Sequence, residues 1–476
     1  MGSLLGHWSD GNGPLHERLT NGLSRVIERG ELPGEALLPT ERELAAELGV
    51  SRTTVVTAYR SLKRTGRLAS RQGRGTWIPR ASSAPRAGSS ARITSELFGS
   101  MFDESDGGLV DLTAACPLAN PVLLDAVGRW TGAELAAGMT GMGYLPGGLP
   151  ELRRAVADRY TARGLPTEPE QVVITNGGQQ AIALIASLLV RPDAAVLMED
   201  PTYPGALDVM RARGARTIAV PMDGDGVLPD VLETQAVRHR PALIYLVPSF
   251  HNPTGALLSP DRGARIAEFS RRTGIPVVDD QVLRQIWIRG RRPPPGLAEH
   301  DPDAPILTIG SLSKTMWGGM RIGWIRAPRS LAERLARARL LADLGGSVPG
   351  QVMALNLMDR FDEAAGVRRE IVRATADVAD AELAARLPGW EYTPPAGGAT
   401  LWVRMPWGDA RGYAQAALRA GVLVLPGSAM SVSGGHEDRL RISLLGEPEA
   451  LREGIRRMAV AWESYRHTAC DDGVVV

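Results

Sequence analysis

The stretch "GSLSKTMWGGMRIGW", residues 310–324, contains Lys314, one of only two lysines in a chain of 476 residues. The other is Lys63, and every other basic side chain apart from histidine is an arginine. An arginine would serve equally well as a surface charge. It would not serve a reaction that needs a neutral amine, because the guanidinium group stays protonated in proteins. We therefore interpret Lys314 as a reactive amine and ask what surrounds it.

A lysine amine can form an imine with an aldehyde, and an aldehyde cofactor that carries a phosphate needs further groups. The run "ITNGGQQAI" places Gly177 and Gly178 between a strand and a helix, where free N–H groups and the helix dipole favour a phosphate; a tight turn explains them equally well. Asp280 ends the apolar run "PVVDD" and is suited to a protonated ring nitrogen, although Asp279 and Asp280 also suit a plain strand end. Tyr203 in "EDPTYPG" is suited to stack on a flat ring, and ordinary packing is the alternative.

The order of these motifs says more than any one of them. "YLPGGLPELR", "NGGQQA", "EDPTYPG", "SFHNPTG", "VVDD", "SLSKT" and "MRIGW" follow one another between residues 144 and 324. Residues 108–466 resemble the fold-type I aminotransferases, which use pyridoxal 5'-phosphate (PLP). The resemblance implies an internal aldimine on Lys314 and a PLP phosphate held by Gly177, Gly178, Gln179, Ser311, Ser313 and Arg321. It also implies contacts from Asn252 to the ring hydroxyl, Asp280 to the ring nitrogen, Tyr144 to the phosphate of a partner subunit, and Arg441 to an effector carboxylate.

The sequence departs from that family at one place. A tyrosine commonly follows the aspartate of the ring nitrogen by two or three residues and contacts the ring hydroxyl. Val282 and Leu283 occupy those positions here, so that hydrogen bond is expected to be missing and full transamination is in doubt. Arg321 follows Lys314 by seven residues, a spacing that resembles regulators rather than many free-standing aminotransferases.

Apolar runs alternate with amphipathic segments through the same region. The runs "QVVIT", "AAVLME", "ALIYLVP", "PVVDD", "ILTIG" and "IGWIRAP" predict an α/β domain with a mostly parallel sheet covered by helices on both faces. Residues 81–107 begin rich in Ser, Ala, Gly and Pro, which is typical of a linker.

Residues 14–80 form a separate pattern of helices followed by a hairpin. Thr40 and Glu43 predict a capping box, Gly49 a helix end, and Ser51 the N-cap of the next helix. "LASRQGRGTWIP" predicts a short hairpin around a Gly-x-Gly turn. The plan is that of a winged helix-turn-helix.

The charge of this unit favours DNA. Residues 51–80 contain eight basic residues and no acidic one, although the whole chain has a net charge of only +1. A helix entering the major groove would offer Ser51, Arg52, Thr53 and Thr54 to the bases, and a wing would bring Arg71 and Arg74 to the phosphates. A three-helix protein-binding module with a solvated basic face is the alternative. The stretch "LPTERELAAELGVSRTTVVTAYRSLKRTGRLASRQGRGTWI" resembles the DNA-binding domain of the GntR family, which implies DNA contacts from Arg42, Arg52, Thr54 and Gly73.

The two halves together resemble the MocR-type branch of the GntR family. The first hypothesis is a homodimeric transcription regulator that binds operator DNA and senses an amine or amino acid. The second is an active aminotransferase with an accessory DNA-binding domain, and the third is a sensor whose only effector is PLP itself. The two cysteines lie far apart, at positions 116 and 470, and no long apolar run or signal peptide is evident; we expect a cytoplasmic protein without a metal site or a membrane partner.

Overall fold

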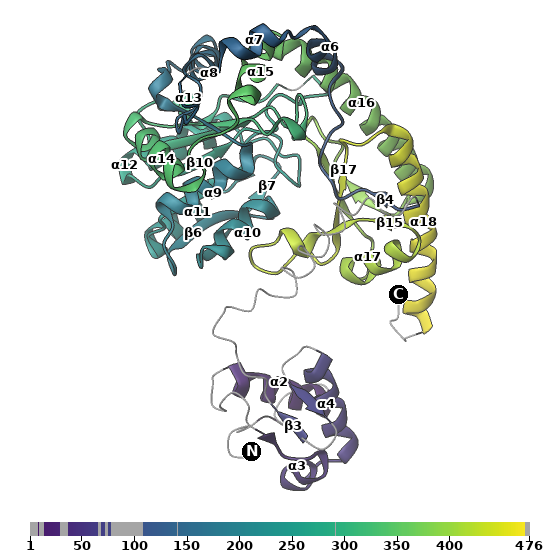
Figure 1. The fold of residues 1–476 in the computed structure, drawn as a ribbon. Helices are drawn as coiled ribbons and strands as arrows, with labels where there is room; N and C mark the ends of the chain where they lie inside the picture. Colours follow the sequence, from purple (N-terminus) through teal and green to yellow (C-terminus); the bar gives the residue numbers. More distant parts are fainter. Residues whose placement is uncertain are drawn as a thin grey trace. The chain divides into compact units, whose positions relative to one another are not determined.

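The computed structural model describes residue 8 and residues 14–28, 37–64, 68–71, 75–77, 108–139, 141–290 and 292–471. The chain divides into two compact units, Met1–Ala87 and Gly88–Val476 (Figure 1). The predicted linker, residues 81–107, lies outside the described residues.

In the residues that the structure describes, the first unit contains three helices and a small sheet. The helices are α2 (Leu15–Glu28), α3 (Glu41–Leu48) and α4 (Arg52–Arg64), and the strands β1 (Leu37–Leu38), β2 (Ala69–Arg71) and β3 (Gly75–Trp77) lie in the order β1-β3-β2. The helix-turn-helix and the hairpin agree with the prediction. Strand β1 was not predicted: Leu37 and Leu38 pair with the outer edge of the hairpin because Leu38 thereby buries its side chain in the core of the unit.

The ends of the helices follow the capping rules. Both halves of the Thr40–Glu43 capping box form, and Gly49 ends α3 with a φ of 66° in the left-handed region that glycine favours. The hydroxyl of Ser51 accepts a hydrogen bond from the backbone N–H of Thr54 at 3.1 Å. These caps set the short turn between α3 and α4, so that α4 begins with Arg52.

The second unit is built around an eight-stranded sheet in the order β5-β12-β11-β10-β9-β6-β7-β8. Its strands are β5 (Val172–Thr175), β6 (Ala195–Asp200), β7 (Arg216–Asp223), β8 (Gly226–Val227), β9 (Leu243–Leu246), β10 (Val277–Asp280), β11 (Ile306–Ser311) and β12 (Gly323–Arg326). The neighbours from β11 to β7 are parallel, which confirms the prediction. Strand β12 runs antiparallel to both neighbours, because the loop from β11 to β12 has no crossover helix and the chain turns straight back.

Helices cover both faces of this sheet. One face packs residues such as Leu197, Ile244 and Val277, and the other packs Val196 and Leu243, as expected for strands buried on both sides. The helices of this part are α6 (Pro121–Arg129), α7 (Gly132–Ala137), α8 (Pro150–Ala162), α9 (Gly178–Leu189), α10 (Pro204–Ala212), α11 (Pro229–His239), α12 (Pro260–Thr273), α13 (Leu297–His300), α14 (Arg329–Ala342) and α15 (Val348–Met358), with 3-10 turns η1 (Pro169–Gln171) and η2 (Gly318–Met320).

A smaller lobe completes the second unit. The strands β13 (Glu391–Tyr392), β14 (Thr400–Arg404), β17 (Arg439–Ser443) and β16 (Leu425–Pro426) form one sheet in that order, and β15 (Val422–Leu423) pairs with β4 (Val110–Asp111). The helices α16 (Phe361–Arg386), α17 (Ala410–Arg419) and α18 (Pro448–Asp471) belong to this lobe, with the 3-10 turn η3 (Gly427–Met430). Helix α18 extends past the predicted domain end at residue 466. Among the described helices, none is both long and apolar enough to cross a membrane.

Candidate functional site

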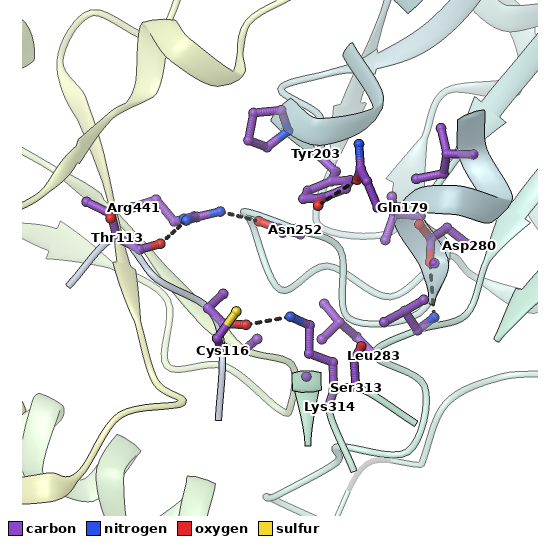
Figure 2. Close-up of a pocket in the computed structure, with 18 of the residues that line it drawn as sticks. Thr113, Cys116, Gln179, Tyr203, Asn252, Asp280, Leu283, Ser313, Lys314 and Arg441 are labelled. Atoms are coloured by element: carbon purple, nitrogen blue, oxygen red, sulfur yellow. Dashed lines mark hydrogen bonds between the residues drawn. The ribbon is translucent and has the colours of Figure 1, made fainter. Parts of the chain in front are cut away.

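Lys314 lies in a cavity of about 220 Å³ at the ends of the central strands (Figure 2). Most of the residues predicted around Lys314 line this cavity together with it: Gly178, Gln179, Tyr203, Asn252, Asp280, Ser313, Arg321 and Arg441. They come from segments up to 263 residues apart, from position 178 to position 441. The fold therefore brings together what the sequence only suggested by motif order.

Lys314 sits in the turn that follows β11, and its Nζ donates to the carbonyl oxygen of Ala115 (Figure 2). Burial lowers the pKa of its amine, which increases the fraction of the neutral nucleophile at neutral pH. Hydrogen bonds from two side chains outside the cavity hold the turn that carries Lys314. The side chain of Asn120 donates to the carbonyl oxygen of Thr315 at 2.8 Å, and Arg368 donates to that of Met316 at 3.1 Å.

The glycine turn before α9 lies against Arg321. Gly177 has a φ of 89° and caps α9 with no side-chain hydrogen bond, so the first N–H groups of the helix have no side-chain cap. A Cβ on Gly177 would lie 3.0 Å from Nη2 of Arg321, and the hydroxyl of Ser311 donates to that of Ser313 at 3.0 Å. Gly177 and Ser311 do not line the cavity, but each contacts a residue that does. Backbone amides, a hydroxyl and a guanidinium converge here, a donor set that suits a phosphate.

Gln179 lines the cavity, as PLP binding would require. Its side chain also contacts Tyr203: the Tyr203 hydroxyl donates to its Oε1 at 3.1 Å, and its Nε2 donates to the carbonyl oxygen of Gly205 at 2.9 Å. These bonds fix the Tyr203 ring at the cavity wall (Figure 2). Burial raises the pKa of Tyr203 to about 12, so its hydroxyl stays protonated.

Strand alternation separates Asp279 from Asp280. Asp280 faces the cavity, and burial raises the pKa of its carboxyl. Its Oδ2 accepts from the hydroxyl of Tyr245 at 2.7 Å, and its Oδ1 accepts from the backbone N–H of Val282 at 3.1 Å. Asp279 instead accepts from Gln281 at 2.8 Å, and burial raises its pKa to about 6. The sequence reading missed Tyr245, although a hydroxyl within the apolar run "ALIYLVP" was a usable signal.

Arg441 reaches the cavity from β17 in the smaller lobe. Its Nη1 donates to Oδ1 of Asn252 at 3.4 Å and its Nη2 donates to the carbonyl oxygen of Thr113 (Figure 2). The side chain is only 5% exposed, its Nε has no hydrogen-bond partner among the described residues, and burial lowers its pKa to about 10. Asp111 acts on this guanidinium through its charge, but no carboxylate of the described residues forms an ion pair with it, so it is suited to receive an anion. The segment that carries Thr113 and Cys116 also lines the cavity and was not predicted.

Two further predictions concern the missing tyrosine at positions 282 and 283 and the exposed Tyr144. Val282 and Leu283 both line the cavity, so no side-chain hydroxyl comes from either position. Tyr144 does not line the cavity of its own chain and is 64% exposed. Within the described ranges, no group of three or more His, Cys, Asp or Glu side chains is arranged to hold a metal ion.

The candidate nucleic-acid surface lies at the start of α4. Ser51, Arg52 and Thr53 are exposed there, Thr54 is half-buried, and Arg42 is exposed on α3. Arg71 ends strand β2, whereas Gly73 and Arg74 lie outside the described residues.

Known proteins match both units. Residues 119–458 match the class I and II aminotransferases, and residues 15–78 match the bacterial regulatory proteins of the gntR family. The HTH-type transcriptional regulator YisV of Bacillus subtilis is 30% identical over 409 residues, which cover 82% of this chain and 84% of YisV. The probable rhizopine catabolism regulatory protein MocR of Rhizobium meliloti is 30% identical over 368 residues, which cover 74% and 73% of the two chains.

Solved aminotransferases share the fold of the second unit. LysN, the α-aminoadipate aminotransferase of Thermus thermophilus, was crystallised with N-(5'-phosphopyridoxyl)-L-leucine. It is 28% identical with a TM-score of 0.69, and the match covers 82% of this chain and all of LysN. The cavity described above thus belongs to a domain with the aminotransferase fold.

Proposed function

The chain belongs to the MocR-type branch of the GntR family of bacterial regulators, and from this we propose that it binds operator DNA through residues 14–80 and senses a small molecule through residues 108–466. One observation carries the sensing part of the proposal: Lys314, Asp280 and Arg441 line one cavity. A regulator of this kind acts on chromosomal DNA, and hence in the cytoplasm.

The residues of the cavity fit PLP. When bound, PLP supplies an aldehyde that reacts reversibly with amines and a ring that withdraws electrons. Lys314 would hold it through a neutral amine, and Ser311, Ser313, Arg321 and the amides after Gly177 would hold its phosphate. Asp280 would keep a proton on the ring nitrogen, while Asn252 would contact the ring hydroxyl and Tyr203 the ring face.

The effector is an amine or an amino acid, or PLP itself. Arg441 favours a carboxylate, because its buried guanidinium has an Nε without a partner among the described residues. An effector that binds one arrangement of the second unit more tightly than another would shift the population toward it and so change DNA binding.

Catalytic turnover is the second candidate function. Lys314, Asp280, Asn252 and Arg441 all line the cavity, and the 2-aminoadipate transaminase of Thermus thermophilus is 32% identical over 311 residues, 63% of this chain and 78% of that enzyme. Val282 and Leu283 count against turnover, because neither supplies the hydroxyl that commonly tunes the ring. Incubation with amino donors and 2-oxo acids, followed by product analysis, distinguishes the two functions. Steady turnover would contradict the hypothesis that the protein is a regulator without enzymatic activity.

Removal of each lysine tests the cofactor. The Lys314→Ala variant is expected to lose the visible absorbance that PLP gives the wild-type protein, because no amine remains in the cavity. The matched control is Lys63→Ala, which removes the chain's other lysine, on α4, and is expected to keep the absorbance unchanged. If Lys314→Ala keeps the same visible spectrum, the assignment is wrong.

Removal of one arginine tests the DNA contact. DNA fragments from upstream of the gene and of its neighbours serve as probes in a gel shift. Arg52→Ala is expected to abolish the specific shift, because Arg52 is exposed at the start of α4, where a recognition helix meets base edges. Arg238→Ala removes an exposed arginine of α11 and is expected to leave the shift intact. Specific binding by Arg52→Ala would mean that α4 is not the recognition helix.

A further inference from the structure

We infer that Tyr245 is a positioning residue of the cofactor site: its hydroxyl orients the Asp280 carboxylate and keeps it ionised for the ring nitrogen of PLP. The inference rests on the proposed binding of PLP. Tyr245 does not line the cavity, so any effect it has must pass through Asp280.

The sheet register explains why the two side chains meet. Strands β9 and β10 are parallel neighbours, and Tyr245 is the partner of Val278. Tyr245, Val278 and, two residues further on, Asp280 therefore point to the same face of the sheet. The Tyr245 hydroxyl extends along that face to Oδ2 of Asp280 at 2.7 Å. Tyr245 is fully buried and Asp280 is 6% exposed, so water does not compete for this hydrogen bond.

The hydrogen bond acts on a carboxylate whose charge is costly. Burial raises the pKa of Asp280, whereas the bonds from Tyr245 and from the N–H of Val282 lower it. The other charged groups that act on it are Lys314, which lowers its pKa, and Glu199, which raises it. One donor on each oxygen also fixes the plane of the carboxylate. Without the hydroxyl, Oδ2 would be buried with one donor fewer, and the ionised form would be less stable.

The Tyr245 hydroxyl does not replace the tyrosine hydroxyl that is missing at positions 282 and 283. Val282 and Leu283 would offer no hydroxyl to a bound ring, whereas Tyr245 offers one to the carboxylate of Asp280. In this chain the electron demand of the PLP ring would therefore be set at its nitrogen, through Asp280, and not at its hydroxyl.

Tyr245→Phe tests the inference, because it removes one oxygen and keeps the ring that packs in the core. We expect the variant to fold and to retain a visible PLP band. We expect about tenfold weaker PLP binding, the effect of one lost hydrogen bond to a charged group. The pH midpoint of the visible band should rise, because a carboxylate that ionises less readily holds the ring proton less firmly and leaves the nitrogen of Lys314 more basic.

Tyr413→Phe is the matched control. Tyr413 is also fully buried, and its hydroxyl donates to the carbonyl oxygen of Met458 at 2.8 Å in the core of the smaller lobe, away from the cavity. Its loss should lower stability to a similar extent and leave PLP affinity and the pH midpoint unchanged. A midpoint that moves equally in both variants would show a general effect of destabilisation and overturn the inference.

A double-mutant cycle with Asp280→Asn tests the route of the effect. Tyr245→Phe should change neither affinity nor midpoint further in an Asp280→Asn background, because no ionisable carboxylate remains to be held. Independent, additive effects would contradict the inference. If the wild-type protein shows the visible band but the pH midpoint of Tyr245→Phe is unchanged, the inference is wrong and the proposed function stands. If the wild-type protein gains no visible band with PLP, the proposed function is wrong as well.

Discussion

Gly177 meets two requirements that only glycine satisfies together. Its φ of 89° lies in the left-handed region, and a Cβ there would approach Nη2 of Arg321 to 3.0 Å. It also packs closely against the start of β12, since a Cβ on Gly323 would lie 2.9 Å from the Cα of Gly177. A single side chain at this position would disturb the turn and the cation beside it.

Gly177→Ala is therefore expected to weaken PLP binding by about tenfold or more, through the displacement of Arg321 from the phosphate. Absorbance titration with PLP measures this. The control is Gly274→Ala at the end of α12, where φ is 71° and a Cβ would meet no atom within 4 Å. Gly274→Ala should lose roughly 1–2 kcal/mol of stability for its left-handed backbone. Gly177→Ala should lose at least as much, because its φ of 89° and ψ of 172° lie in a region that almost only glycine adopts. Equal loss of PLP affinity in both would show that the phosphate role of this turn is wrong.

At the scale of the elements, the carboxylate of Asp200 at the end of β6 holds the loop before β17 through several hydrogen bonds. Asp200 accepts hydrogen bonds from the backbone N–H groups of Val432 and Ser433, each at 3.1 Å, and from the hydroxyls of Ser431 and Ser433. His436 Nε2 lies 3.3 Å from Asp200 Oδ1. Burial alone would raise the pKa of Asp200, but these hydrogen bonds outweigh it and lower the pKa to about 2. The contact joins the smaller lobe to the segment that carries Tyr203.

Asp200→Asn should accordingly cost about 2 kcal/mol of stability at neutral pH, the free energy of a pKa lowered from 3.8 to about 2. Because the folded pKa is the lower one, the stabilisation is present above pH about 4 and is lost as the pH falls toward 2. Urea unfolding of wild type and variant at several pH values measures the difference. A difference that already disappears between pH 7 and pH 5 would mean that another group is responsible.

At the scale of the whole molecule, several large apolar side chains of the second unit remain exposed. Leu118, Met142, Tyr144 and Leu341 are 62%, 89%, 64% and 92% exposed. The segment after Leu341 lies against the segment after Tyr144, since a Cβ on Gly345 would lie 2.5 Å from the carbonyl oxygen of Leu145. Leu118 lies near the turn that carries Lys314, since Arg368 donates to the carbonyl oxygens of both Leu118 and Met316. Such a patch is typical of a protein interface. We propose that a second copy of the chain covers it, which would also place Tyr144 near the partner's site.

Leu341→Glu should therefore convert a dimer into a monomer, because a carboxylate in an apolar interface loses its hydration. Light scattering after size-exclusion chromatography gives the mass. Val237→Glu on α11 is the control, since Val237 is 75% exposed outside these segments. A wild-type protein that is monomeric, or a Leu341→Glu variant that stays dimeric, would contradict this interface.

Motif order and strand pattern were sufficient to predict both folds and most of the cavity. What they missed depended on partners distant in sequence. Asp280 was predicted, but its spacing did not indicate that Tyr245 on the neighbouring strand would donate to it, and Gln179 could not be linked to Tyr203 from spacing alone. Tyr245 was missed because its hydroxyl, although a usable signal, can be assigned a partner only when the register of β9 and β10 is known. Strand β1 was missed because two leucines before a helix carry no strand pattern of their own.

The loop between β11 and β12 has a consequence for how such a domain can diverge. Ser311 and Gly323 pair across its base, and Lys314 and Arg321 both lie within it, so the proposed lysine anchor and one proposed phosphate anchor belong to a single short segment. Residues that would tune reactivity, such as those at 282 and 283, lie after a different strand. Mutation can therefore alter the chemistry of the ring without touching this loop. On the proposed roles, retention of a ligand and turnover of a substrate would depend on different segments of this domain.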